Sequence, residues 1–123
     1  MPRDIRLYLD DIVEAIDRIL DYVGKMNFAQ FAADQKTIDA VVRNLEIIGE
    51  AARNLPEETR ISSREMEWRK IVGLRNVLIH QYFGINNPIV WDVVQNKLGR
   101  LKSTCEKRRE IEPEGGKEES GEY

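Results

Sequence analysis

The sequence predicts an all-α fold, an antiparallel bundle of four to five helices. Apolar residues recur at three- and four-residue spacing in separate segments, which is the pattern of helices that bury one face. Proline and polar stretches separate these segments. No segment shows a convincing alternation of period two, and the chain has no internal repeat. Short connections between helices favour antiparallel neighbours, and hence a largely up-and-down bundle.

The first helix is predicted near the N-terminus. Its apolar positions follow helical spacing: Ile5, Leu9, Ile12, Val13, Ile16, Ile19, Leu20 and Val23. Charged residues fill the opposite face, as expected of a solvated helix surface. Gly24 follows the last apolar position, and a glycine there favours a helix end. Because the apolar rhythm is close to seven residues, this helix also qualifies as a dimer seam.

A short turn with Phe28 and Phe31 precedes the second helix and is predicted to pack onto the bundle. Asp34 or Thr37 is predicted to cap the second helix. Pro56 is predicted to end it, because proline and the residue before it disfavour helix. The apolar face comprises Ile38, Val41, Val42, Leu45, Ile48, Gly49, Ala52 and Leu55.

The third and fourth helices lie on either side of a loop at residues 84–88. The third is predicted from Trp68 to about Tyr82. Pro88 suits the first turn of the fourth helix, where its missing amide hydrogen is no loss. The inner face of the fourth helix is predicted to comprise Val90, Val94, Leu98, Leu101 and Cys105, with Trp91 beside them.

The 123 residues predict one folded domain, residues 1–105, followed by a disordered charged tail, residues 106–123. The tail carries four basic and seven acidic residues, a net charge of −3, which equals the net charge of the whole chain. The domain therefore has 15 basic and 15 acidic residues (19 − 4 and 22 − 7), a net charge of zero. Binding to a nucleic acid would depend on a local basic patch rather than on a global field.

The single cysteine excludes an internal disulfide and is typical of a reducing cytosol. One cysteine and one histidine argue against a zinc site, so we predict no metal and no cofactor. The sequence begins without an apolar signal segment, and no apolar run approaches the ~20 residues that span a bilayer. We therefore expect a cytoplasmic protein that does not enter a membrane.

The run from Arg75 to Tyr82 is the strongest candidate for chemistry. It also contains Asn76 and His80, the only histidine, in a segment that is otherwise mostly apolar. An arginine donates two parallel hydrogen bonds to a phosphate. An imidazole, which titrates near pH ~6.5, exchanges protons at neutral pH. This combination predicts chemistry on a phosphodiester.

The helical arrangement of these residues favours a site shared between two copies of the chain. On a helix with ~3.6 residues per turn, Arg75 lies within an apolar arc, whereas Asn76 and His80 share another stripe. Arg75 and His80 are five residues apart, about 140° around the axis. A single regular helix does not bring them to one atom, but two facing copies would. We therefore predict a homodimer with the active centre between the protomers.

Each motif residue also has a structural interpretation. A buried guanidinium needs an anionic partner, and Glu46 or Glu50 on the second helix would supply one for Arg75. A lone histidine is more often structural than catalytic, and Tyr82 alone is more often an aromatic at the edge of the core. Composition and spacing alone favour these interpretations over catalysis.

The spacing Arg75-x4-His80-x-Tyr82 resembles the signature of the HEPN superfamily, and Asn76 directly after the arginine resembles its HepT toxin family. The flanking segments extend this resemblance. Residues 43–51, RNLEIIGEA, are similar to the family's second helix, and residues 68–76, WRKIVGLRN, are similar to its approach to the motif.

The resemblance covers residues 3–105. It departs from the family pattern at Asn86 and Asn87, because family members often carry an aspartate shortly after the tyrosine. This departure puts in doubt a charged role at that position but leaves the core motif unchanged.

The resemblance implies a homodimeric helical bundle that acts as a metal-independent ribonuclease toxin of a bacterial or archaeal toxin–antitoxin pair. Arg75, His80 and Asn76 would be catalytic. The partner would be a minimal nucleotidyltransferase antitoxin, which in this family transfers AMP from ATP to the motif tyrosine, here Tyr82.

A second hypothesis is a non-catalytic helical module that binds and regulates a nucleotidyltransferase. Tyr82 motivates it, since the motif would then hold a nucleotide or an AMP group. The zero net charge of residues 1–105 also motivates it, because a protein that binds RNA usually carries excess positive charge.

Overall fold

The computed structural model describes residues 4–61, 68–73 and 86–112 of the chain. Every regular element in these residues is an α-helix, so the predicted all-α class is confirmed. The helices are α1 (Ile5–Val23), α2 (Phe28–Ala32), α3 (Gln35–Arg53), α4 (Glu57–Ile61), α5 (Trp68–Val72), α7 (Asn87–Asn96) and α8 (Leu98–Ile111).

Helix α1 ends at Gly24, as its sequence predicts, and Asp4 caps its start. The Asp4 carboxylate accepts a hydrogen bond of 3.0 Å from the backbone amide of Arg6, which satisfies one of the unpaired amides of the first turn. Gly24 ends the helix with a φ of +51°, a value that side chains disfavour. Its amide donates to the carbonyl of Leu20.

The turn that contains the two phenylalanines is a short helix, α2. Asn27 and Gln30 form a reciprocal capping box at its start, with hydrogen bonds of 2.8 and 2.9 Å. Phe31 is fully buried, as predicted, whereas Phe28 remains 38% exposed. Asp34 is the N-cap of α3, because its carboxylate accepts a hydrogen bond from the amide of Thr37 at 3.1 Å. Of the two residues predicted as this cap, Asp34 and Thr37, the structure therefore selects Asp34.

The fourth predicted helix is divided into two helices, α7 and α8. Asn86 caps α7 by accepting from the amide of Ile89 at 3.1 Å, and Pro88 lies in its first turn. Lys97 separates α7 from α8. The spacing of the inner face continues across Lys97, so periodicity could not reveal the division.

Helix α8 continues past residue 105, where we predicted the folded domain to end. It runs to Ile111, and charged side chains support the additional turns. Arg108 forms an ion pair with Glu112 at 3.0 Å, and Arg109 forms one with Asp10 of α1. The charged composition that predicted a tail is thus, as far as residue 112, the solvated surface of a helix.

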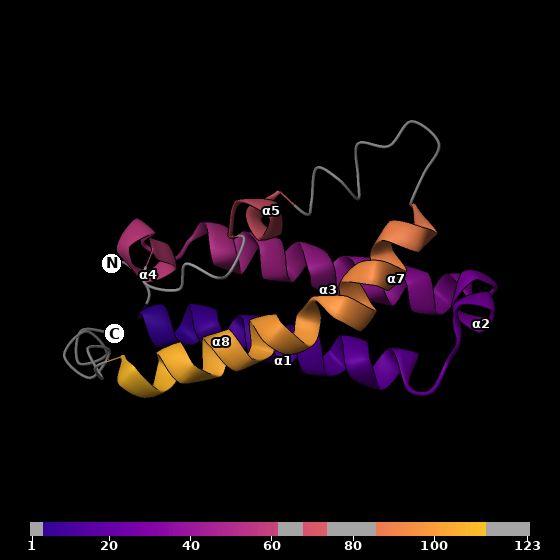
Figure 1. Ribbon diagram of the computed structural model, residues 1–123, viewed down its shortest axis with the longest axis horizontal. Helices are drawn as coiled ribbons and strands as arrows, with labels where there is room; N and C mark the ends of the chain where they lie inside the picture. The colour runs from indigo at the N-terminus through magenta and orange to yellow at the C-terminus, as the bar shows by residue number, and fades with distance from the viewer. Residues whose placement is uncertain (1–3, 62–67, 74–85, 113–123) are drawn as a thin grey trace.

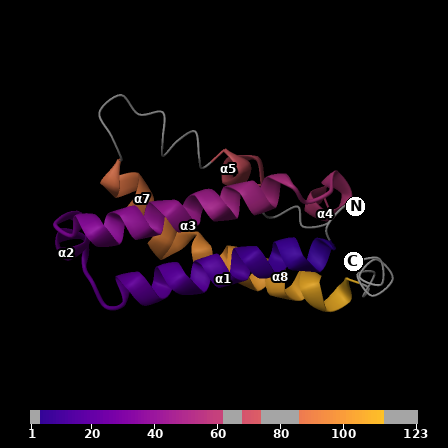
Figure 2. The same ribbon diagram turned by 180° about the vertical axis from the view of Figure 1, so that it is seen from behind.

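The long helices α1 and α3 lie side by side and antiparallel, joined at one end by α2 (Figure 1). Helix α8 packs along α1, while α7 crosses towards α2. Helix α5 packs on the outer side of α3. The view from behind shows α1 and α3 in front of α7 and α8, so one face of the α1–α3 pair is not covered by those two helices (Figure 2).

The core is formed by the apolar faces of α1, α3, α7 and α8. All eight positions predicted on the second helix and all five on the fourth are buried. In α1, Leu9, Ile12 and Ile16 are fully buried in the core of the protomer itself, so this stripe is not free to act as a dimer seam. The prediction for Leu20 is wrong, because its side chain is 41% exposed at the edge of the stripe. None of the described helices is both long enough and apolar enough to cross a membrane.

Candidate functional site

The motif residues Arg75, Asn76, His80 and Tyr82 lie outside the described residues. The structure does describe the chain on both sides of them, because α5 precedes the motif and α7 follows it. These two helices determine where the motif segment begins and where it ends.

Helix α5 anchors the start of the motif segment on α3. Trp68 is buried in the core, and the partly buried side chains of Ile71 and Val72 pack against this core. Gly73 follows, and its amide donates to the carbonyl of Arg69 at 3.0 Å. A Cβ at Gly73 would lie 3.2 Å from that same carbonyl oxygen, closer than a side chain normally tolerates. The glycine thus allows this close backbone contact at the end of α5.

Helix α7 fixes the other end of the motif segment. Asn86, one of the two asparagines at which the chain departs from the family pattern, serves as the N-cap of α7. Trp91, on the same helix, packs against Phe31 with ring centroids 5.2 Å apart and against Phe28 at 6.1 Å. These contacts join α7 to α2, although Pro88 and Ile89 in the first turn of α7 are exposed.

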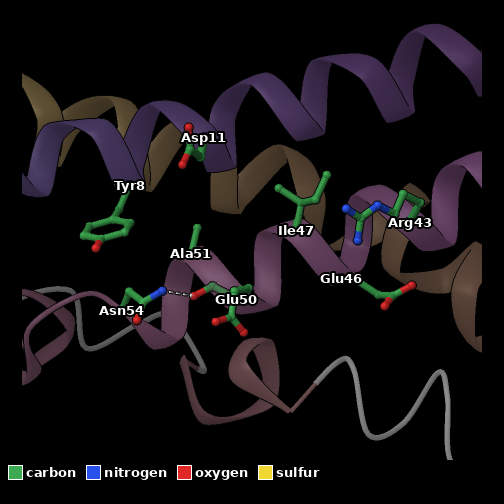
Figure 3. Close-up of a pocket in the computed structure, with 8 residues that line it drawn as sticks. All are labelled: Tyr8, Asp11, Arg43, Glu46, Ile47, Glu50, Ala51 and Asn54. Carbon is green, nitrogen blue, oxygen red and sulfur yellow. Dashed lines mark hydrogen bonds between the residues drawn. The ribbon is translucent and has the colours of Figure 1, made fainter. Parts of the chain in front are cut away.

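A groove of about 230 Å³ lies between α1 and α3 (Figure 3). Tyr8 and Asp11 of α1 form one wall. The α3 side is formed by Arg43, Glu46, Ile47, Glu50, Ala51 and, directly after the helix, Asn54. Apolar surface from Ile47 and Ala51 therefore lies among charged and hydrogen-bonding groups.

Glu46 and Glu50, predicted as partners for Arg75, both line this groove one helical turn apart on α3. Glu46 is half-buried and Glu50 is exposed. Glu50 already has a cationic neighbour, because its carboxylate lies 3.9 Å from Arg53 with both side chains largely exposed. Whether either carboxylate meets Arg75 stays a prediction, since Arg75 lies outside the described residues.

Sequence reasoning did not single out Tyr8, Asp11 or Arg43 as groove residues. Asp11 belongs to the charged side of α1, whose composition is typical of a solvated face. Arg43 is part of the segment that resembles the family's second helix, which was the one available signal. Only the packing of α1 against α3 brings these three side chains together.

The groove is chemically mixed. It carries the carboxylates of Asp11, Glu46 and Glu50 together with the guanidinium of Arg43. Within residues 4–61, 68–73 and 86–112, no three or more His, Cys, Asp or Glu side chains are grouped closely enough to hold a metal ion. Charge, hydrogen-bonding groups and apolar surface are what this groove offers.

A buried polar contact connects α1 and α3 farther along the same pair. Asn44 is only 5% exposed, and its amide donates to the carbonyl of Ala40 at 2.9 Å. Its side-chain oxygen accepts from Arg18 of α1 at 3.4 Å. The contact adds a polar link between the two helices that form the groove.

Comparison with known proteins identifies the family. A family model described as "Ribonuclease HepT-like" matches residues 12–108, which include the whole motif from Arg75 to Tyr82. The chain belongs to the HepT-like ribonuclease family. The predicted resemblance to HEPN and HepT proteins is therefore confirmed.

Individual relatives agree with this assignment. "Putative RNase MJ0127" of Methanocaldococcus jannaschii is 44% identical over 116 residues, covering 93% of this chain and 96% of the relative. "Probable ribonuclease HepT" of Thermococcus cleftensis is 40% identical over 109 residues, covering 89% and 99%. "Putative RNase TTE0752" of Caldanaerobacter subterraneus subsp. tengcongensis is 38% identical over 97 residues, covering 79% and 87%. No solved structure matches significantly.

Proposed function

We propose that this member of the HepT-like family is a metal-independent endoribonuclease toxin of a toxin–antitoxin pair. The observation that carries the proposal is the complete motif, from Arg75 to Tyr82, within the residues matched by the family model. The names of the relatives, which describe ribonucleases, support the activity.

In the proposed reaction, the ribose 2′-oxygen attacks the adjacent phosphorus and the bond to the 5′-oxygen breaks. His80 takes the 2′-hydroxyl proton or gives a proton to the leaving 5′-oxygen. Arg75 stabilises the additional negative charge of the five-coordinate transition state. Asn76 orients His80 or binds a phosphate oxygen. The products are a 2′,3′-cyclic phosphate and a 5′-hydroxyl, and no step needs a metal.

The proposed active centre lies between the two protomers of a homodimer. The support is helical periodicity, which separates Arg75 from His80 by about 140° on one regular helix. Two facing motifs combine the arginine of one protomer with the histidine of its partner. Glu46 and Glu50 are proposed to support the site by positioning Arg75 through an ion pair from the surface of α3.

Tyr82 is proposed to switch the toxin off. Its hydroxyl oxygen attacks the α-phosphorus of ATP, the proton is lost to solvent or a base, and pyrophosphate leaves. A cognate nucleotidyltransferase antitoxin catalyses this transfer. The bulky anionic AMP group blocks the cleft and competes with RNA for Arg75. The single cysteine of the chain supports action in the cytoplasm, where thiols stay reduced and RNA is present.

RNA cleavage by purified variants tests the ribonuclease assignment. We expect His80→Ala and Arg75→Ala each to abolish cleavage and growth inhibition while the dimer persists. Arg69→Ala is the matched control, because Arg69 is an exposed arginine on α5 just before the motif, and it should cleave normally. Excess EDTA should leave the rate unchanged. A folded His80→Ala protein that cuts RNA at the wild-type rate would falsify the assignment.

Mass spectrometry after incubation with the cognate nucleotidyltransferase and ATP tests the switch. We expect one AMP on Tyr82 of the wild type and none on Tyr82→Phe. AMP on Tyr82 without cleavage of any RNA by the unmodified dimer would favour the alternative, a non-catalytic module that regulates its nucleotidyltransferase. Absence of AMP on Tyr82 would remove the modification from both hypotheses.

Charge neutralisation tests the supporting role of the carboxylates. Glu46→Gln and Glu50→Gln keep the size of each side chain but remove its charge. If one of them holds Arg75, that variant loses cleavage and the other loses much less. Equal, wild-type rates for both would contradict a supporting role.

A further inference from the structure

Helix α8 carries basic residues on two sides, and those on one side are paired with acidic residues of α1. On the side that faces α1, Lys102 is bonded to Asp17 and Arg109 to Asp10, so these two cations are already neutralised by the fold. The other side, which we call the outer flank, carries Lys97 directly before the helix, then Arg100 and Lys107. All three outer-flank residues are exposed.

None of the three outer-flank residues makes an ion pair in the described part of the chain. At about 100° per residue, Lys97 and Lys107 both fall within ~60° of Arg100 around the helix axis. Their side chains therefore form one row rather than a scatter of charges around the helix.

Of the exposed acidic residues of α8, Glu106 lies away from this row, whereas Glu110 lies beside its last member, about 60° from Lys107 around the axis. Glu106 and Glu110 are about 120° and 80° from Arg100 around the axis. The charge of Glu106 acts on the opposite side of the helix, where it contributes to the raised pKa values of Lys102 and Cys105, behind the larger effects of the Asp17 hydrogen bond and of burial. The outer flank therefore keeps a local positive charge, above all at Lys97 and Arg100, although the whole chain has a net charge of −3.

We propose that the outer flank of α8 binds the phosphate backbone of the RNA substrate, outside the catalytic motif. This inference rests on the proposed ribonuclease function and names a substrate-binding surface for it. The row from Lys97 to Lys107 spans about 15 Å at 1.5 Å per residue. Phosphates follow one another every ~3.4 Å along one strand of a duplex, so a row of this length meets several of them.

An RNA backbone fits this surface better than a protein partner does. Protein interfaces have an apolar centre, usually with aromatic residues. The apolar residues Leu98, Leu101 and Cys105 of α8 are buried in the core, and Ile111 at the end of the helix is its one exposed large hydrophobic side chain. A row of exposed cations without an apolar centre is what backbone contacts without sequence preference require.

Binding of a fluorescent single-stranded RNA with 2′-O-methyl groups tests the inference, because this probe lacks the 2′-hydroxyl needed for cleavage. The test variant is Lys97→Gln/Arg100→Gln/Lys107→Gln. We expect its Kd at moderate salt to be roughly ten- to a hundredfold weaker than that of wild type. Each single-strand phosphate contact contributes about 0.7 to the slope of log affinity against log salt, so the slope should fall by about 2.

The matched control is Lys25→Gln/Lys36→Gln/Arg69→Gln, which removes three exposed cations that lie outside α8 and has the same change in net charge. It should bind like wild type. Equal weakening in both triple variants would overturn the proposal, because a general charge effect would then explain the loss. Circular dichroism confirms that both variants fold.

The outcomes separate this inference from the proposed function. A wild-type protein that binds the probe through the outer flank but cuts no natural RNA refutes the ribonuclease and leaves the binding surface. A wild-type protein that cuts RNA, with probe binding unaffected by the outer-flank variant, refutes the binding surface alone. Loss of nucleotidyltransferase binding with unchanged RNA affinity would assign the flank to that protein and also overturn the proposal.

Discussion

Lys102 of α8 places its Nζ 2.8 Å from Oδ1 of Asp17 on α1. Together with the pair between Arg109 and Asp10, this contact links one side of α8 to α1 at two points about two helical turns apart. The burial of Leu98, Leu101 and Cys105 sets the rotation of α8 about its own axis, and the two partly exposed ion pairs reinforce it. This rotation turns the outer flank towards solvent.

The pair between Lys102 and Asp17 predicts a stability contribution that depends on pH. The hydrogen bond to Asp17, and then the charge of Asp17, raise the pKa of Lys102 above its ordinary 10.5. The contribution is therefore fully present below 10.5 and is lost as the pH rises through the pKa of the folded state. We expect Asp17→Asn to lower the Tm slightly at neutral pH and to match wild type at strongly alkaline pH.

Thermal unfolding followed by circular dichroism at several pH values measures this difference. Asp39→Asn is the control, since Asp39 is an exposed aspartate of α3 with no lysine or arginine ion pair in the described residues. Added salt should shrink the effect of Asp17→Asn, because both partners are partly exposed to solvent. An effect of Asp17→Asn that grows with pH would contradict the ion-pair explanation.

We predict that truncating the side chain of Leu45 causes a large loss of stability. Its side chain is fully buried in α3 between α1 and the other core helices. Leu45→Ala should lower the free energy of unfolding by about 2–5 kcal/mol, because it removes buried apolar surface and leaves a cavity. Leu7→Ala, at a side chain that is 43% exposed, should change it by less than roughly 0.5 kcal/mol. Chemical denaturation gives both values, and similar losses would contradict the assigned core.

We predict that alanine substitutions at two glycines change the stability of the fold in opposite directions. Gly24 has a φ of +51°, so Gly24→Ala should destabilise the fold by about 1–3 kcal/mol. Gly99 lies in the first turn of α8 with a negative φ, and a Cβ there would meet nothing within 4 Å. Gly99→Ala should therefore stabilise the fold by about 0.4–1 kcal/mol through the loss of unfolded-state entropy. Denaturation curves give the change in the free energy of unfolding for each variant. If both substitutions change it in the same direction, one of these backbone assignments is wrong.

We predict that the thiol of Cys105 is unreactive while the protein is folded. Its side chain is fully buried, and burial, followed by the charge of Glu106, raises its pKa to about 12. The reactive thiolate is therefore scarce and inaccessible at neutral pH. Alkylation by iodoacetamide, followed by mass spectrometry, should be very slow in buffer and fast in denaturant. Rapid alkylation of the native protein would contradict the burial of Cys105.

Much of the helical core could be predicted from the sequence. The three- and four-residue spacing identified the buried face of α3, including Leu45 and Ile48, because periodicity reports which side of a helix avoids water. The same reasoning failed at Leu20, which lies at the edge of the α1 stripe. Periodicity cannot tell an edge position that a neighbouring helix covers from one that it leaves exposed.

The candidate site also has one part that could be predicted from the sequence and one part that could not. The motif from Arg75 to Tyr82 could be recognised without coordinates because its residue types and spacing carry the chemistry. The groove that joins Tyr8 to Glu46 could not, since these residues are 38 positions apart (46 − 8) and only the packing of α1 on α3 brings them together.

The sequence by itself determined that this chain is all-helical, which faces of its helices avoid water, and which family motif it carries. Local spacing and residue chemistry are sufficient for those conclusions. The tertiary structure alone decided the division at Lys97, the extension of α8 to Ile111, and which cations of α8 are paired with α1. The ion pairs depend on contacts between α8 and α1, which are distant in the chain, and the spacing of apolar residues along one helix does not reveal any of these features.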